Sequence, residues 1–131
     1  MFALEVQFPF SALILSGEKT IETRAYPLPT SLHGVGILLC ESSSGADCVS
    51  SIGDSVAAAQ AGLSLIGEVF FSSSKEYKSQ AEWDTDREKH KVPKESKYEW
   101  APTEIGVRYG WQIERVLIYT SPLPVTAMTR R

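Results

Sequence analysis

The sequence predicts an α+β fold, a small and partly closed mixed β-barrel of about five or six strands with short helices at its ends. Strand patterns outnumber helix patterns, and they are spread along the whole chain. The chain has 131 residues, of which 43% are hydrophobic and 22% charged, and it contains no internal repeat. This length and composition are typical of a single globular domain, which we expect to cover residues 1–131.

The amino-terminal segment predicts a strand followed by a short helix. Residues 2–7 alternate apolar and polar side chains, which is typical of a strand with one buried face. Pro9 suits the first turn of a helix, and apolar residues follow at helical spacing from Phe10 to Leu15. Gly17 is a natural left-handed end for this helix.

Three longer strands are expected further along the chain. Residues 35–40 form a continuous apolar run, which is typical of a strand buried on both faces. Residues 65–71 form another strand, in which Gly67 marks a bulge or a close approach of two backbones. The last long strand covers residues 107–119, and the Ser-Pro-Leu-Pro run of residues 121–124 is expected to break it.

Weaker patterns predict four smaller features. A capped turn of helix is expected over residues 56–60, and another helix within residues 74–89, with Pro93 ending any helix before it. Residues 125–128 predict a short final strand, and residues 129–131 a tail.

The charge distribution indicates a candidate site near the end of the first helix. Lys19 and Arg24 are the only basic residues among the first sixty. Strand alternation over residues 20–24 places Ile21 on the core face and Glu22 with Arg24 on the opposite face. Lys19 joins these two only if the turn after the helix redirects its side chain. A structural ion pair between Glu22 and Arg24 is the alternative to a binding site.

The motif Gly-x-Lys-Thr-x-Glu-x-Arg at residues 17–24, after a helix that begins near Pro9, resembles the signature of the ASCH domain family, a branch of the PUA-like superfamily. Three later segments resemble the pattern of small stand-alone members of that family. These are Ile-Gly-Glu-Val at 66–69, a Trp-to-Pro pattern over 83–93 and Tyr-Gly-Trp-x-Ile at 109–113. The resemblance therefore covers nearly the whole chain.

The resemblance implies a PUA-like mixed barrel with flanking short helices. It also implies a cleft lined by Lys19, Glu22 and Arg24 that holds RNA or a nucleotide-like small molecule. The leading interpretation is therefore a binding module for RNA or nucleotides, and the residues favour binding over catalysis.

One branch of the family implies an alternative, an amidohydrolase acting on acylated nucleosides such as N4-acetylcytidine. Its proposed catalytic set is a Lys, a Thr three residues later and a downstream Glu. Lys19 matches the Lys, but Glu22 stands at the position of the Thr, and strand alternation puts Thr23 on the other face. In a hydrolase, Lys19 and Glu22 would be the catalytic residues, with Glu22 as a general base.

Four more residues are candidates for ligand binding. Glu41, at the end of a buried strand, either faces the same cleft or is a solvated strand end. Tyr109 and Trp111 either stack on a base or pack in the core. His90 either acts as a general acid or base or hydrogen-bonds a backbone carbonyl and fixes the loop before Pro93.

Residues 75–99 carry seven basic and seven acidic side chains, which is typical of a solvated face. Aromatic and His side chains are interleaved with these charges, and they predict a covered core edge or a ligand contact: Tyr77, Trp83, His90, Tyr98 and Trp100. A third interpretation is therefore a protein-interaction domain that binds its partner through residues 75–99.

Composition excludes several classes of function. The net charge of −3 argues against indiscriminate nucleic-acid binding. Cys40 and Cys48 are too few for a disulfide scaffold, so we expect reduced thiols, with Cys40 in the core. No metal-ligand spacing or cofactor motif is present, and neither a metal nor a cofactor is expected. The chain has no long apolar run and no signal-like start, which predicts an intracellular protein, cytoplasmic or nuclear.

Overall fold

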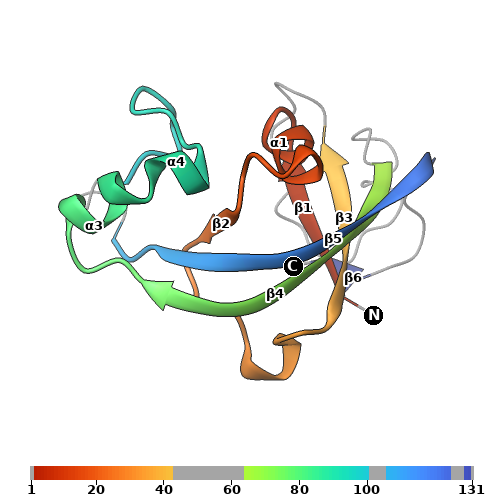
Figure 1. The fold of residues 1–131 in the computed structure, drawn as a ribbon, viewed down its shortest axis with the longest axis horizontal. Coiled ribbons are helices and arrows are strands. Elements are labelled where there is room, and N and C mark those ends of the chain that lie inside the picture. The colour runs from red at the N-terminus through yellow and green to blue at the C-terminus, as the bar shows by residue number, and fades with distance from the viewer. Residues whose placement is uncertain (1, 43–63, 101–105, 125–128, 131) are drawn as a thin grey trace.

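The computed structural model describes residues 2–42, 64–100, 106–124 and 129–130. Its elements in chain order, labelled in Figure 1, are β1 (Phe2–Gln7), α1 (Phe10–Ser16), β2 (Ile21–Arg24), the 3₁₀ helix η1 (Thr30–Leu32), β3 (Gly36–Ser42), β4 (Ser64–Glu76), α3 (Gln80–Thr85), α4 (Arg87–His90), β5 (Tyr109–Pro124) and β6 (Thr129–Arg130). Strands dominate and the helices are short, as the α+β prediction requires.

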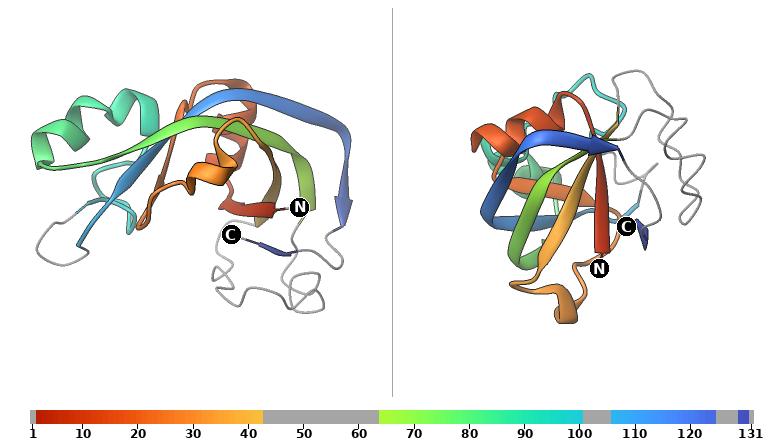
Figure 2. Two further views of the ribbon diagram at one scale, coloured as in Figure 1. Left: turned by 90° about the horizontal axis from the view of Figure 1, so that it is seen from below. Right: turned by 90° about the vertical axis from the view of Figure 1, so that its right-hand side faces the viewer.

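The strands form one mixed sheet with the order β2-β5-β4-β3-β1-β6. β1 runs parallel to β3 and β6, and the other neighbours are antiparallel. The long strands β4 and β5 bend strongly, so that the sheet curls into a half-barrel (Figure 2). The Arg24 side chain of β2 spans the open side of the half-barrel, where its Nη2 donates to the Glu5 carbonyl oxygen of β1 at 2.8 Å.

The main hydrophobic core lies on one face of the curled sheet. α1 and η1 contribute Ile14 and Leu32 to it, and the central strands contribute Phe71 and Trp111. A smaller cluster of Ala3, Leu38, Cys40 and Leu65 shows that β3 is also covered on its other face. The prediction of a strand buried on both faces, with Cys40 in the core, is therefore confirmed.

The registry of β2 corrects the prediction of which of its faces points to the main core. Glu22 lies opposite Trp111 of β5, and opposed residues in a sheet share a face. Glu22 and Arg24 therefore point to the side of the main core. Ile21 points the other way, toward Tyr77, and a Cβ at Gly110 would meet side-chain atoms of both. Ile21 is buried as predicted, but β2 is covered on both faces, which the alternation of four residues could not reveal.

The predicted ends of the last strands are wrong. β5 continues through the Ser-Pro-Leu-Pro run to Pro124, and Leu123 and Pro124 still pair with β4. In the described part of the sheet, β2 pairs only with residues 109–112 of β5, so the rest of that edge needs no N–H donor, and proline is tolerated there. β6 covers Thr129–Arg130, which were predicted as a tail. Residues 125–128 and the helix predicted over 56–60 lie outside the described residues.

The charged segment forms two short helices beside β2 rather than one. Residues 74–76 belong to β4, and α3 and α4 follow, both before Pro93 as predicted. None of the described helices is long and apolar enough to cross a membrane. The prediction at Gly67 is confirmed, because a Cβ there would lie 2.3 Å from the Leu117 carbonyl oxygen, where the registry of β4 shifts.

Candidate functional site

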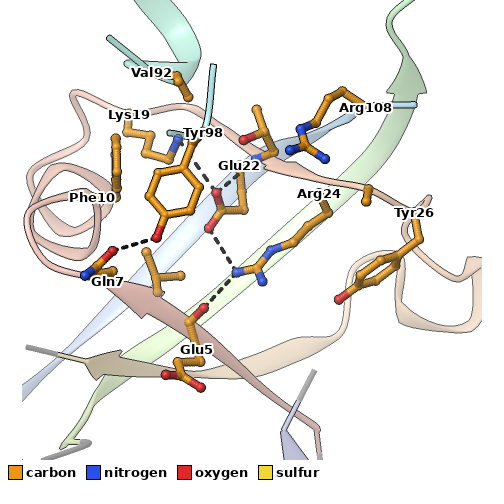
Figure 3. A pocket seen from close by; sticks show the side chains of 13 residues that line it. Glu5, Gln7, Phe10, Lys19, Glu22, Arg24, Tyr26, Val92, Tyr98 and Arg108 are labelled. Carbon is orange, nitrogen blue, oxygen red and sulfur yellow. Dashed lines mark hydrogen bonds and ion pairs between the residues drawn. The ribbon is translucent and has the colours of Figure 1, made fainter. Parts of the chain in front are cut away.

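A cleft of about 310 Å³ opens where the edge of β2 faces β1 across the mouth of the half-barrel (Figure 3). Its walls come from β1, the start of α1, β2 and the segment after it, the loop after α4, and the residue before β5. The lining residues are Glu5, Val6, Gln7, Phe10, Lys19, Glu22, Thr23, Arg24, Ala25, Tyr26, Val92, Tyr98 and Arg108. Lys19, Glu22 and Arg24 are thus brought together in one cleft.

The turn after α1 redirects Lys19 toward Glu22. Gly17 adopts φ +84°, which ends the helix in the left-handed region, and its N–H donates to the Ile14 carbonyl oxygen at 3.2 Å. The Lys19 N–H then donates back to Leu13 O at 2.9 Å. With the backbone held in this way, Lys19 leaves the face that strict alternation from Ile21 would assign to it.

The Lys19 side chain is almost completely buried, with 1% of its surface exposed. Its ammonium group donates to the His90 carbonyl oxygen, lies 3.7 Å from Glu22 Oε1 and sits 5.3 Å from the centre of the Phe10 ring. Burial lowers the pKa of Lys19, and the nearby Glu22 carboxylate opposes this shift. The ammonium is held by the protein itself rather than presented to solvent.

Glu22 is the counter-ion that joins the two basic residues. Its Oε1 accepts from the Thr23 N–H at 2.9 Å, and its Oε2 lies 3.4 Å from Arg24 Nη2. The ion pair between Glu22 and Arg24 therefore exists and also forms part of the cleft wall, so the two interpretations of this pair are compatible. The Arg24 side chain is 22% exposed, and its buried Nε has no hydrogen-bond partner among the described residues.

Three aromatic rings border the cleft. The Phe10 and Tyr98 rings meet edge to face at 5.7 Å, and the Tyr98 hydroxyl donates to Gln7 Oε1 at 2.6 Å. Tyr26 lies on the other side of Arg24 in Figure 3 and is 39% exposed. Its ring packs edge to face on Trp111, which orients it. Tyr26 therefore offers an accessible ring face beside a cationic side chain.

Arg108 completes the cationic side of the cleft. It stands just before β5, and its side chain is partly buried in the cleft wall. Among the described residues, no carboxylate pairs with its guanidinium. Burial lowers the pKa of Arg108, although an arginine in such a site stays charged at neutral pH.

The four other predicted ligand-binding residues do not line this cleft. Glu41 accepts a hydrogen bond from Ser11 Oγ at 2.6 Å. The Tyr109 hydroxyl donates to Glu76 Oε1 at 3.2 Å. Trp111 is a core residue with 1% exposure, and its indole N–H donates to the Tyr26 carbonyl oxygen at 3.0 Å. Trp111 thus supports the cleft from behind and has no free face for stacking.

His90 lies behind the cleft with both ring nitrogens engaged. Nε2 lies 2.9 Å from the Trp83 carbonyl oxygen, and Nδ1 accepts from the Val92 N–H at 3.0 Å. These partners require a neutral ring with its proton on Nε2. Burial lowers the pKa of His90 to about 4. The ring therefore fixes the loop before Pro93 and is not a general base for the cleft.

The aromatic residues of the charged segment form a second core. Tyr77, Trp83, Val92 and Trp100 pack together beside β2. Arg87 and Glu99 lock this unit, because Arg87 Nη2 lies 2.8 Å from Glu99 Oε2 and the Trp83 indole donates to Glu99 Oε1. A covered core edge therefore explains these rings, and a protein partner for residues 75–99 stays a prediction. In the described part of the chain, no three His, Cys, Asp or Glu side chains are grouped to hold a metal ion.

Sequence reasoning missed Gln7, Phe10, Tyr26 and Arg108 as members of the site. Tyr98 had a signal, because an aromatic residue in a charged loop must cover something. The residues around Arg108 carried no such signal, since its place in the cleft depends on where β5 begins in the fold. These contacts join segments up to 91 residues apart, as for Tyr98 and Gln7, and a local pattern cannot encode them.

The fold and site together define a small α+β half-barrel with a charged, aromatic cleft at its open edge. No protein-family model matches the chain, and no curated protein matches it in sequence. Among solved structures, the chain is similar to a serine-to-alanine mutant of ZmASCH from Zymomonas mobilis, with a TM-score of 0.58 and 16% sequence identity. The match covers 92% of this chain and 71% of that chain. The chain therefore has the fold of an ASCH protein, and the predicted PUA-like fold is confirmed.

Proposed function

We propose that this protein is an ASCH-family binding module whose cleft holds one nucleotide unit, either a free nucleotide or one residue of single-stranded RNA. The observation that carries the proposal is the composition of the cleft. Arg24 and Arg108 supply positive charge that a ligand can reach, while Tyr26 and Tyr98 supply aromatic rings in the same cleft. Lys19 forms part of the wall with Glu22. Cations suit a phosphate group, and aromatic rings suit an unstacked base.

The size of the cleft limits how much ligand can enter. A volume of about 310 Å³ lies at the small end of the range for small-molecule pockets. A single nucleotide unit is of this order, whereas an RNA strand is far larger. In an RNA complex, we therefore expect one splayed nucleotide to occupy the cleft while its neighbours run along the surface.

The polar groups of the cleft have separable roles in this proposal. Glu22 holds Lys19 and Arg24 in place and neutralises much of their charge. Arg24 is anchored through Nη2 on the Glu5 carbonyl oxygen and Glu22 Oε2, which leaves its Nη1 group for a ligand. With few available cations, the affinity for RNA should fall with salt concentration along a shallow slope.

The test is a calorimetric titration of the protein with nucleoside monophosphates and with short single-stranded RNA. We expect Arg24→Ala and Tyr26→Ala each to weaken binding by about tenfold or more, as for a charged hydrogen bond or a stacked base. Arg115→Ala is the matched control, because Arg115 stacks on Phe70 at 4.1 Å and does not line the cleft. Unchanged affinity for nucleotides and RNA in both cleft variants would contradict the proposal.

The hydrolase alternative rests on one observation, the buried Lys19 with a lowered pKa beside Glu22. Such an amine is a candidate for proton transfer. Against it, Glu22 stands at the position of the nucleophilic Thr, and Thr23, although it borders the cleft, lies opposite Gly110 on the other sheet face from Glu22. Incubation with a panel of acylated nucleosides, with Glu22→Gln as the control, tests this alternative. Absence of turnover at high protein concentration would remove it for those substrates.

A further inference from the structure

We propose that Arg108 is the specificity-determining residue of the cleft, and that it selects a ligand carrying a terminal phosphate over the same nucleoside without one. The inference rests on the proposed function and adds to it the chemical class of the ligand, a phosphomonoester. Free nucleotides and the phosphorylated ends of RNA share this group.

Lys19 is not available for a phosphate group. Its side chain is 1% exposed, and its ammonium is engaged by the His90 carbonyl oxygen and by Glu22 Oε1 at 3.7 Å. A ligand that approached this ammonium would have to displace partners that belong to the fold.

Arg24 is committed in part. Its Nη2 donates to the Glu5 carbonyl oxygen at 2.8 Å and lies 3.4 Å from Glu22 Oε2. Among the described residues its Nη1 group makes no hydrogen bond, and its side chain is 22% exposed, so Arg24 can still donate to a ligand. However, its charge is already compensated by Glu22, and it therefore attracts an anion less than an unpaired guanidinium does.

Arg108 differs from both, because its guanidinium has no ion pair or hydrogen bond among the described residues. Partial burial in the cleft wall also removes part of its hydration, which lowers its pKa, and no carboxylate of the described segments offsets that cost. Figure 3 shows Arg108 on the opposite side of Glu22 and Arg24 from Glu5. A phosphate at Arg108 would compensate a partly dehydrated charge on the side of the cleft away from the Glu5 carboxylate.

The backbone holds Arg108 in a defined position. The Arg108 carbonyl oxygen accepts from the Tyr77 N–H at 2.9 Å, and the Trp100 indole donates to the Gly106 carbonyl oxygen at 2.6 Å. Both anchors belong to the second core beside β2. A planar guanidinium presented from a fixed backbone suits bidentate contact with phosphate oxygens.

The experiment compares four nucleosides, their 5′- and 3′-monophosphates, and a short RNA with and without a terminal phosphate. For the wild-type protein, we expect the phosphorylated form to bind at least about tenfold more tightly, as expected for one charge-assisted contact. Arg108→Gln should abolish this preference by weakening the phosphorylated form at least about tenfold more than the nucleoside, since it removes the charge and keeps donor groups. Arg108→Lys should retain part of the preference, and Arg115→Gln all of it.

The outcomes separate this inference from the proposed function. Equal binding of nucleosides and monophosphates by the wild-type protein overturns the role of Arg108 and leaves the nucleotide cleft standing. The same holds if Arg108→Gln weakens both ligand forms equally while its thermal unfolding midpoint matches wild type. If the wild-type protein binds none of these ligands, both the inference and the proposed function fail.

Discussion

The Lys19 ammonium lies 3.7 Å from the Glu22 carboxylate, and both side chains are nearly buried in the wall of the same cleft. Lys19 reaches this place because the left-handed Gly17 and the bond from Lys19 N to Leu13 O turn the chain back on α1. Glu22 reaches it because it shares a sheet face with Trp111 and the main core. A buried charge pair of this kind costs desolvation energy, which a second hydrogen-bond partner for each charge helps to offset.

The coupling between Lys19 and Glu22 is measurable by a double-mutant cycle with Lys19→Met and Glu22→Gln. Glu22→Gln leaves the Lys19 ammonium without its counter-ion and should cost about 3 kcal/mol of unfolding free energy. In the Lys19→Met background the same change should cost less, with a coupling of about 1–2 kcal/mol. Denaturant titration gives the four values, and additivity within about 0.5 kcal/mol would show that the pair does not interact.

Protonation of His90 is expected to lower the free energy of unfolding in weak acid. Burial lowers the pKa of His90 to about 4, whereas an unfolded His titrates near 6.5. The unfolded chain therefore binds the proton first as the pH falls. The contribution of neutral His90 to the free energy of unfolding is complete above pH 6.5. It is lost between pH 6.5 and 4, by about 3 kcal/mol in total.

Two variants isolate this effect, because the chain contains only two His residues. His90→Asn should flatten the change in unfolding free energy between pH 6.5 and 4. His33→Asn is the matched control, since His33 is exposed, and it should keep the wild-type profile. If His90→Asn and the wild-type protein lose stability in parallel over this range, other groups cause the acid sensitivity.

Gly67 predicts a steric limit on the sheet. An added Cβ would lie 2.3 Å from the Leu117 carbonyl oxygen, and backbone cannot move aside as a flexible side chain can. Gly67→Ala should therefore cost about 3 kcal/mol. Gly34→Ala is the comparison, because its Cβ would meet open space and only its φ of +71° is unfavourable, at about 1 kcal/mol. Equal losses for the two variants would contradict the close approach of β4 and β5.

Glu99 is expected to couple the stability of the second core to ligand binding in the cleft. Burial alone would raise the pKa of Glu99, but hydrogen bonds from Arg87 and Trp83 outweigh it and lower the pKa. Glu99→Gln should cost about 1–2 kcal/mol of stability, because it removes the charge from these bonds. It should also weaken ligand binding, since Tyr98 is its neighbour in the chain and lines the cleft.

The control for this variant is Glu88→Gln. Glu88 is 94% exposed and lies 3.8 Å from Lys91, so its ion pair is solvated and should contribute less than about 0.5 kcal/mol. A Glu99→Gln protein as stable as Glu88→Gln would show that the hydrogen bonds from Arg87 and Trp83 to Glu99 do not stabilise the fold.

The part of the structure that depends on local pattern could be predicted from sequence. Alternation defined β1, an apolar run defined β3, and Gly17 defined the end of α1. Gly67 could be identified because only a close approach or a bulge favours glycine inside a strand. In each case the information lies within a few neighbouring residues.

The part that depends on distant contacts could not be predicted. Trp111 resembles a stacking residue in the sequence, but its partners Phe71 and Tyr26 come from other segments and bury it. Arg108 has no local signal, because only the fold leaves it without a carboxylate among the described residues. Similarly, β5 passes two prolines because its edge is unpaired in the described sheet, which depends on where β2 ends.

The most direct test of the central claim is a two-dimensional amide NMR titration of the assigned protein with a nucleoside monophosphate. We predict saturable shifts at the cleft, including the amides of Gln7, Thr23, Tyr26 and Arg108, with α3 and the exposed Leu117 and Ile118 of β5 unaffected. No shifts at millimolar nucleotide, or shifts confined to α3 and α4, would contradict the assignment of this cleft as the nucleotide site.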